Sequence, residues 1–150
     1  MSFTFKGGVH PPAHKELSDR KNIEYMPPPA TVYIPLSQHI GKAAKAVVAV
    51  GDKVVEGQKI GEADGMLSAH VFSSVCGTVK AIETRATSAG KCEHIVIERD
   101  TAEEKPEAFR FPSLSVRDGK HILERIKDCG IVGMGGAGFP THVKLSPKEK

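Results

Sequence analysis

The sequence predicts a mainly β protein, a small barrel or sandwich that follows an extended arm and precedes a helix and a glycine-rich loop. Three observations predict this arrangement. Residues 31–97 hold at least six short β-type segments with turn residues between them, residues 1–30 are rich in proline and glycine, and only residues 115–130 show a helical apolar period. A chain of 150 residues has room for one ordinary domain and part of another.

Composition excludes several classes of protein. The net charge is only +3, and the sequence holds no lysine- or arginine-rich block with aromatic residues between the charges, so we expect no nucleic acid as partner. The longest apolar run, residues 43–50, is short and interrupted by Lys45, so we expect no direct membrane span and a soluble chain. No apolar stretch follows Lys6, which argues against a secretory signal.

The potential metal ligands and nucleophiles are scattered. Cys76, Cys92 and Cys129 lie far apart, which argues against a disulfide framework and a CxxC metal site, and indicates a reducing compartment. We interpret each cysteine as a small, partly buried apolar residue. Two prolines separate His10 from His14 and disfavour a helical metal pair. We therefore predict no metal site and no catalytic acid, base or nucleophile.

Residues 1–30 are expected to form an extended arm that wraps a neighbouring surface, with one helical turn at residues 13–17. The barrel or sandwich is assigned to residues 31–100 and a charged, proline-containing linker to residues 101–114. The expected strands are residues 31–35, 46–50, 53–55, 59–62, 70–72, 76–82 and 94–98.

A turn motif refines the β class. Residues 50–61, which contain GDKVVEGQ, and residues 75–82, which contain CGTVKA, resemble biotinyl and lipoyl carrier domains. This resemblance implies a barrel-sandwich hybrid fold. Three glycines of the motif, Gly51, Gly57 and Gly77, are expected at corners with positive φ, and Val54 and Ile60 are expected to point inward.

One residue of the carrier pattern is missing. A carrier domain needs a lysine at the tip of the hairpin between the two motif halves, and Gly65 stands there instead. Because glycine offers no amine for biotin or lipoate, we interpret the domain as structural or docking. Carrier function remains the least favoured alternative.

The helix before the glycine loop has start and stop signals. Ser115 is the expected N-cap, with Asp118 supplying charge in the first turn. Ile122 and Ile126 belong to one apolar stripe, and Gly130 is a natural C′ residue. Residues 115–150 are assigned to the truncated start of an α/β domain. Since this helix lacks a sheet on which to bury its stripe, we expect slow amide exchange in residues 31–97 and fast exchange after residue 130.

The glycine loop carries the functional signal. Its GxGxxG spacing alone is weak, because a helix precedes it instead of a strand. The longer string GMGGAGFPTHVK is similar to the flavin loop of the NADH-oxidising subunit of respiratory complex I. Glycines allow backbone N–H groups to converge on phosphate and ring oxygens. The candidate binding residues are Gly133, Gly135, Gly136, Gly138, Phe139, Thr141 and Lys144.

The residues around this motif narrow the family. Complex I subunits usually have arginine where this loop has Met134, and the tail Thr141–Lys144 together with residues 5–12 (FKGGVHPP) resembles the RnfC subunits of Rnf electron-transport complexes. The resemblance extends over essentially the whole chain. It implies FMN and NAD(H) at the loop, and a place at the cytoplasmic side of the bacterial inner membrane among the other subunits of the complex.

Members of that family continue into a region with two CxxCxxCxxxCP runs that hold [4Fe–4S] clusters, and this chain has neither run. We therefore expect [4Fe–4S] clusters only in the absent C-terminal region, and we expect the chain alone to be inactive. The leading hypothesis is a fragment of an electron-transfer subunit that moves electrons between NAD(H), flavin and iron–sulfur clusters, coupled to ion transport in the whole complex. The alternative is a non-catalytic docking or assembly module of that complex.

Overall fold

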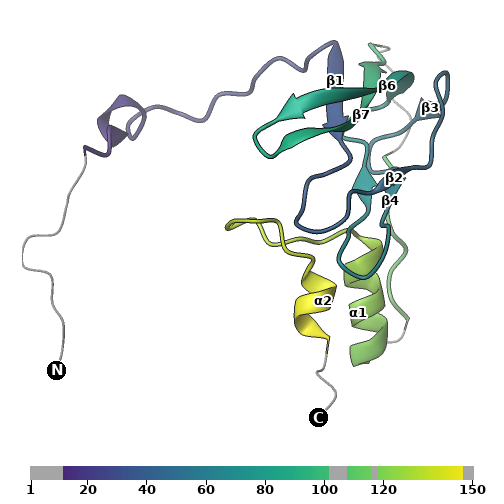
Figure 1. Ribbon diagram of the computed structural model, residues 1–150. Helices are drawn as coiled ribbons and strands as arrows, with labels where there is room; N and C mark the ends of the chain where they lie inside the picture. Colours follow the sequence, from purple (N-terminus) through teal and green to yellow (C-terminus); the bar gives the residue numbers. More distant parts are fainter. Residues whose placement is uncertain (1–11, 102–107, 116–117, 147–150) are drawn as a thin grey trace, which may run out of the picture.

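A computed structural model describes residues 12–101, 108–115 and 118–146. Figure 1 shows a β structure in the upper part of the molecule and two helices side by side below it. Residues 12–30 run from the β structure toward the left of the view without folding back onto it. The mainly β class expected from the sequence is confirmed.

Two sheets make up the β structure. The larger sheet has the strand order β1–β7–β6–β3, and all three of its strand pairings are antiparallel. Its strands are β1 (Thr31–Pro35), β3 (Lys53–Val54), β6 (Gly77–Thr87) and β7 (Gly90–Arg99). The smaller sheet has the order β2–β4–β5, also antiparallel, with β2 (Lys45–Ala46), β4 (Lys59–Glu62) and β5 (Val71–Phe72).

The core of this barrel lies where the two sheets meet. Leu36, Ile60, Val79, Ile95 and Ile97 each have 0% relative exposure, and all belong to one contiguous cluster. They come from both sheets and from the segment after β1, so burial of their apolar surface joins the sheets. The inward orientation expected of Val54 and Ile60 is confirmed, because both side chains are buried in this cluster.

Strand bounds agree with the sequence in part. Residues 31–35 and 59–62 form strands as expected. The expected strand at residues 46–50 was wrong, because β2 ends at Ala46. A turn begins earlier than the apolar run suggests: the Asp52 carboxylate accepts a hydrogen bond from the Ala49 N–H over 2.8 Å.

The two longest strands, β6 and β7, extend beyond the expected segments at residues 76–82 and 94–98. They pair over their whole lengths as a hairpin, with an irregularity in register between Val79 and Ala81. The charged outer half of this hairpin lacks the apolar alternation that marks a buried strand, which is why the pattern underestimated both strands.

Two of the three glycines expected at corners have the positive φ that such a corner requires. Gly51 has φ +98° and Gly57 has φ +83°, as expected. The expectation for Gly77 was wrong, because this residue lies within β6 and does not have positive φ. Its requirement for glycine comes from crowding, since a Cβ there would overlap the carbonyl oxygen of Glu98 on β7.

The N-terminal arm contains one 3₁₀ turn, η1 (Lys15–Leu17), within the segment expected to form a helical turn. Every residue from 12 to 30 is exposed. Its exposed apolar side chains include Ile23 at 92% and Tyr25 at 95% relative exposure. At its root, the Arg99 side chain donates to the Pro29 carbonyl over 3.0 Å, which ties the arm to β7.

The helix α1 (Gly119–Asp128) starts later than expected. The assignment of Ser115 as N-cap was wrong: Asp118 is the N-cap, and its carboxylate accepts from the His121 N–H over 2.9 Å. The expected helix end is confirmed, because Gly130 has φ +60° just after the C-cap Cys129. The second helix, α2 (Thr141–Leu145), packs beside α1.

Residues 108–112 run between the barrel and α1. The Phe109 N–H donates to the Glu56 carbonyl over 2.7 Å. The Phe111 ring lies edge-to-face against Phe72 of β5 and against Phe109, and the Arg125 guanidinium of α1 stands over its face. These contacts join the C-terminal part to the smaller sheet.

Candidate functional site

The glycine loop, residues 133–139, is closed at its base by backbone pairing. The Gly133 N–H donates to the Phe139 carbonyl over 2.9 Å, and the Thr141 N–H donates to the Ile131 carbonyl over 3.0 Å. An isolated antiparallel bridge joins Val132 to Pro140 between them. The structure therefore brings the two ends of the predicted binding motif together and projects the residues between them as one loop.

The crest of the loop is open. Within the described part of the chain, and leaving the adjacent residues aside, no atom lies within 4 Å of the position that a Cβ would occupy at Gly135 or Gly136. Both glycines are exposed, and Met134 beside them is 98% exposed. A flat ring or a phosphate can therefore approach the backbone of these two glycines without meeting a side chain of their own, as close binding by main-chain N–H groups requires.

Gly138 differs from the crest glycines because it faces the barrel. It has φ +64°, and a Cβ there would lie 2.8 Å from the Gln38 carbonyl oxygen and 3.0 Å from the His39 Cα. The N–H of the next residue in that segment, Ile40, donates to the Ala137 carbonyl over 2.9 Å. Gly138 is thus required for packing against the barrel, a reason that the motif alone did not contain.

The other three candidate binding residues follow the crest. Phe139 is 40% exposed, and the Pro140 next to it is fully buried. Thr141 begins α2, and Lys144 lies in the last turn of the same helix. Among the described residues Lys144 forms no salt bridge.

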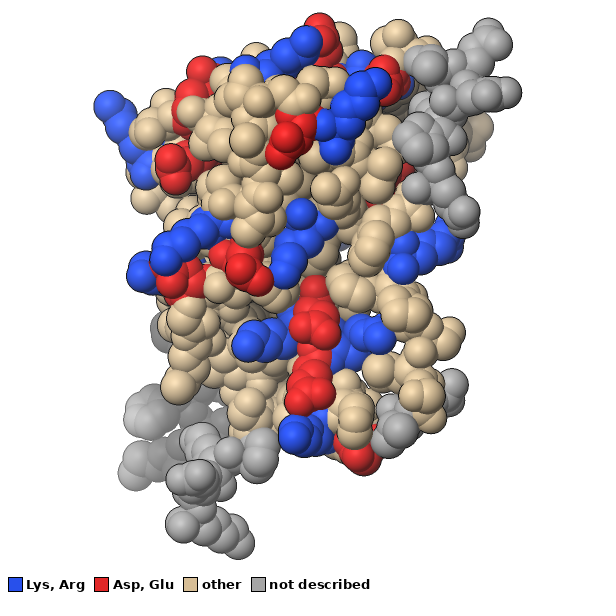
Figure 2. Space-filling model, turned by 90° about the vertical axis from the view of Figure 1, so that its right-hand side faces the viewer, with Lys and Arg blue, Asp and Glu red and all other residues tan. Residues whose placement is uncertain are grey.

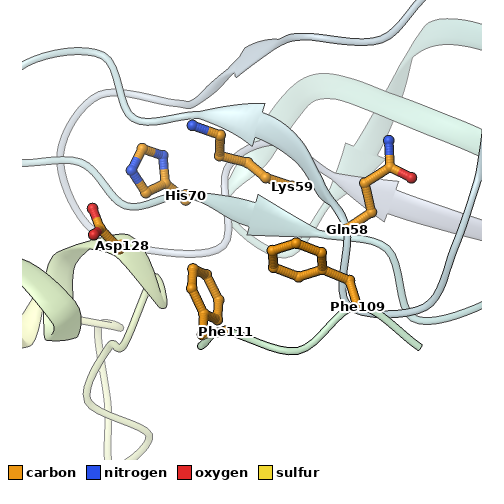
Figure 3. A pocket seen from close by; sticks show the side chains of 6 residues that line it. All are labelled: Gln58, Lys59, His70, Phe109, Phe111 and Asp128. Carbon is orange, nitrogen blue, oxygen red and sulfur yellow. The ribbon is translucent and has the colours of Figure 1, made fainter. Parts of the chain in front are cut away.

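A cavity of about 290 Å³ lies at the junction of the barrel, residues 109–111 and the end of α1. Figure 3 shows the Lys59, His70 and Asp128 side chains toward one side, and the Phe109 and Phe111 rings along another. Gln58 completes the lining. A second, more polar hollow of about 570 Å³ shares Lys59, His70 and Asp128 and extends to Gly65 and Lys127. Neither is lined by residues of the glycine loop.

The chemistry of the cavity centres on His70. Its Nδ1 accepts a hydrogen bond from the Ala63 N–H over 3.0 Å, so in the neutral ring Nε2 carries the proton. Burial lowers the pKa of His70, and the nearby Lys59 ammonium lowers it further, while Glu62 and Asp128 oppose the shift. The cavity therefore presents an uncharged imidazole N–H donor beside a carboxylate and an ammonium.

Charge of both signs is spread over the face that Figure 2 displays, where Lys and Arg side chains alternate with Asp and Glu. The salt bridges between Lys59 and Glu62, at 3.0 Å, and between Asp64 and the two lysines Lys42 and Lys45 show the same mixing at the rim of the smaller sheet. The Lys59–Glu62 pair is exposed on both sides, and a pair of this kind contributes little to stability individually.

Gly65, which stands where a carrier domain has its lysine, lies at an exposed tip. Gly65 is exposed, has φ +100°, and lies in the connection between β4 and β5. The connection is tied down on both sides: the Asp64 N–H donates to the Ser68 hydroxyl, which donates in turn to the Lys42 carbonyl. The tip thus combines an exposed glycine with an anchored base.

Metal-ligating side chains do not gather in the described ranges 12–101, 108–115 and 118–146, where no group of three or more His, Cys, Asp or Glu is suitable for a metal ion. In the same part of the chain, neither helix is long and apolar enough to cross a membrane.

Sequence reasoning missed the barrel residues that contact the loop and the residues that line the cavity. Gln38, His39 and Ile40 stand in an ordinary turn segment, and nothing in their order signals a contact with residues 137–138. The closely spaced Phe109 and Phe111 were the available signal for the cavity, because two aromatic residues are unusual in a charged linker.

Known proteins show the family of this chain. Residues 3–102 match the model of the RnfC barrel sandwich hybrid domain. The RnfC subunit of the proton-translocating ferredoxin:NAD(+) oxidoreductase complex of Clostridium ljungdahlii is 44% identical, over 98% of this chain and 33% of its own length. Its counterpart in the Na(+)-translocating ferredoxin:NAD(+) oxidoreductase complex of Acetobacterium woodii is 41% identical, over 98% of this chain and 34% of its own length.

A third relative, the RnfC subunit of the ion-translocating oxidoreductase complex of Rhodobacter capsulatus, is 37% identical over 100% of this chain and 30% of its own length. The chain thus spans about a third of the length of these relatives. The resemblance drawn from the arm, the turn motif and the glycine loop is confirmed, and the mainly β part is a barrel-sandwich hybrid. By its matching domain and its relatives, the chain belongs to the RnfC family.

Proposed function

We propose that this chain is the nucleotide-holding N-terminal part of an electron-transfer subunit in an ion-translocating ferredoxin:NAD oxidoreductase complex. In that role the subunit moves electrons between NAD(H), flavin and iron–sulfur clusters. The relatives named above are subunits of such complexes. The observation that carries the proposal is the open crest of the glycine loop above a base closed by backbone hydrogen bonds.

The residues present fit a bound FMN or NAD(H). Gly135 and Gly136 leave the backbone accessible to phosphate or ring oxygens, and Gly133 closes the base of the loop through its N–H bond to the Phe139 carbonyl. Phe139, which is 40% exposed, offers an apolar face to an aromatic ring. When bound, the flavin supplies the hydride and single-electron chemistry that these side chains lack.

Two further side chains complete the proposed site. The Thr141 hydroxyl is a hydrogen-bond donor at the start of α2, and Lys144 places an ammonium in the same short helix for a phosphate. We assign Gly138 to the site as a packing residue, because its Cβ position faces Gln38 and His39.

The proposal includes organisation and location. Residues 1–30 act as the arm, residues 31–100 as the barrel domain, residues 101–114 as the linker, and residues 115–150 as the start of the FMN- and NADH-binding domain. The [4Fe–4S] clusters belong to the remainder of the longer subunit. The subunit lies peripherally on the cytoplasmic side of the bacterial plasma membrane, against the other subunits of the complex.

The test of the site uses the full-length subunit and titration with FMN and NADH. Gly136→Trp fills the open crest, and we expect at least a tenfold loss of FMN affinity. Val50→Trp is the matched control, because it adds the same ring at a position that is already 62% exposed, in the turn before β3. Unchanged affinity in Gly136→Trp would refute the assignment of the loop, as would an equal loss in both variants.

A docking or assembly module is the second candidate, and the arm favours it. Residues 12–30 are all exposed, including Ile23 and Tyr25, which carry large apolar surface. Co-purification of the complex with the Ile23→Ser/Tyr25→Ser variant tests this role. Loss of the subunit from the complex with FMN affinity unchanged supports docking by the arm, whereas full retention contradicts it.

A further inference from the structure

We infer that the barrel positions the glycine loop through residues Gln38–Ile40, and that this seat sets how tightly the loop binds its ligand. The inference rests on the proposed function for its ligand, while the seat itself is a feature of the described contacts. It assigns the barrel a part in nucleotide binding, although no residue of the barrel belongs to the glycine motif.

The first contact of the seat is a backbone hydrogen bond. The Ile40 N–H donates to the Ala137 carbonyl over 2.9 Å. This bond directs one carbonyl of the loop toward the barrel, which constrains the orientation of the peptide unit that joins Ala137 to Gly138. Because Ala137 lies between the open Gly136 and the packed Gly138, the bond acts directly beside the crest.

The second contact is close packing at Gly138. Its backbone adopts φ +64° and approaches so closely that a Cβ would lie 2.8 Å from the Gln38 carbonyl oxygen. Only glycine combines this conformation with this approach. The loop is therefore held against the seat at two successive residues, 137 and 138.

His39 anchors the seat to the rest of the barrel through hydrogen bonds of its ring. Its ring is 8% exposed, and Nε2 accepts the Ala69 N–H over 3.1 Å. Since an N–H group can only donate, Nε2 is unprotonated, and in the neutral ring Nδ1–H donates to the Ile40 carbonyl over 3.1 Å. One imidazole thus links the segment before β5 to Ile40, whose own N–H holds the loop.

The ends of the loop are also held by the barrel. A Cβ at Gly130, before the loop, would lie 2.5 Å from the His70 carbonyl oxygen and 2.7 Å from the Phe72 ring. After the loop, the His142 side chain of α2 lies near the backbone of Met66 at the tip of the β4–β5 connection. The barrel thus contacts the segment before, within and after the crest.

A glycine-rich loop has high conformational freedom when it is unsupported, and a ligand must remove that freedom on binding. A seat that removes it beforehand raises affinity without touching the ligand. His39 and Ile40 are accordingly positioning residues, and their loss should weaken binding by loosening the loop.

The experiment compares two buried histidines of the barrel in the full-length subunit. His39→Ala removes the support of the seat, and His94→Ala is the matched control, because His94 is 6% exposed and lies on β7 with Nδ1 against the Cys92 carbonyl. Amide exchange at Ile40, Gly133 and Thr141 reports the loop without ligand, and FMN titration reports affinity.

We expect His39→Ala to speed exchange at these three amides at least tenfold and to weaken FMN binding at least fivefold, with neither change in His94→Ala. Gly138→Ala disrupts the contact between the seat and the loop from the loop side, and it should change exchange and FMN affinity as His39→Ala does. It is therefore the deciding variant if His39→Ala does not fold. Unchanged exchange and affinity in Gly138→Ala would overturn the inference.

The two proposals fail differently. If Gly136→Trp abolishes FMN binding while Gly138→Ala and His39→Ala leave exchange and affinity unchanged, the seat is refuted and the proposed function stands. If Gly136→Trp leaves binding unchanged, the proposed function is refuted. The inference that the seat positions the loop for its ligand is then refuted as well, even if the exchange data show the contact between the seat and the loop.

Discussion

The carbonyl oxygen of Glu98 on β7 occupies the space that a side chain at Gly77 of β6 would need. The two residues lie across neighbouring strands, where Gly77 pairs with Arg99 and Thr78 pairs with Glu98. The neighbour of Gly77 is backbone held by the sheet, so it cannot move aside as the end of a flexible side chain could. Glycine at this position is therefore a requirement of strand packing.

Gly77→Ala should lower the free energy of unfolding by about 1–3 kcal/mol, because the added methyl group forces β6 away from β7. Gly119→Ala is the matched control: among the described residues outside its own helix backbone and chain neighbours, its Cβ would meet no atom within 4 Å. At the first residue of α1, alanine should be neutral or stabilising by up to about 1 kcal/mol. Urea denaturation followed by circular dichroism measures both, and equal midpoints for the two variants would contradict the packing argument.

The core predicts a graded response to truncation. Ile60 has 0% relative exposure, so Ile60→Val should lower the free energy of unfolding by about 0.5–1.5 kcal/mol and Ile60→Ala by about 2–5 kcal/mol. The same change at the arm, Ile23→Val, removes a methylene group from a side chain that is 92% exposed and should have no measurable effect. A comparable loss at residue 23 would mean that the arm folds against the core.

The N-cap of α1 can be tested by a pair of alanine variants. The Asp118 carboxylate accepts from the His121 N–H, and this bond lowers the pKa of Asp118. Asp118→Ala should therefore speed amide exchange at His121 and fray the first turn, whereas Ser115→Ala should leave exchange in residues 119–128 unchanged. Faster exchange in Ser115→Ala, with no change in Asp118→Ala, would show that Ser115 is the N-cap, as the sequence suggested.

His70 predicts a pH dependence with a defined sign. Burial first, and Lys59 second, lower its pKa below the usual value of 6.5. Between the folded and unfolded pKa values the unfolded chain binds more protons, so stability rises with pH in that window. The contribution of His70 is fully present above the unfolded value and is lost as the pH falls through 6.5 toward the folded value.

The measurement compares urea midpoints at pH 7.5 and 5.5 for the wild type and for His70→Gln. Glutamine keeps an oxygen that can accept the Ala63 N–H but does not titrate, so the loss of stability on acidification should become smaller. Some loss should persist, because burial also lowers the pKa of His142. An identical pH dependence in both proteins would contradict the role given to His70.

The docking of α1 on the barrel depends on Phe111. Its ring lies edge-to-face with Phe72, with ring centroids 6.0 Å apart, and the Arg125 guanidinium stands 5.5 Å from its centroid. Phe111→Ala should therefore speed amide exchange throughout residues 119–128 and leave exchange in β6 and β7 unchanged. Phe111→Leu, which keeps the apolar bulk, should have the smaller effect.

Local patterns in the sequence were sufficient for much of the protein. Proline and glycine content predicted the arm, short β-type segments bounded by turn residues predicted β1 and β4 within their bounds, and the two turn motifs indicated a barrel-sandwich hybrid. The string from Gly133 to Lys144, taken together with residues 5–12, was sufficient to indicate the family. Each of these signals is carried by neighbours in the chain.

The tertiary structure decided what depends on distant residues. It showed why glycine is needed at positions 77 and 138: the Glu98 carbonyl lies too close to Gly77 for a Cβ, and the Gln38 carbonyl lies too close to Gly138. Neither approach can be predicted from local spacing. It also placed the Ile40 N–H on the Ala137 carbonyl. Such contacts form between backbone groups, which every sequence shares, so only the folded path of the chain determines which of them meet.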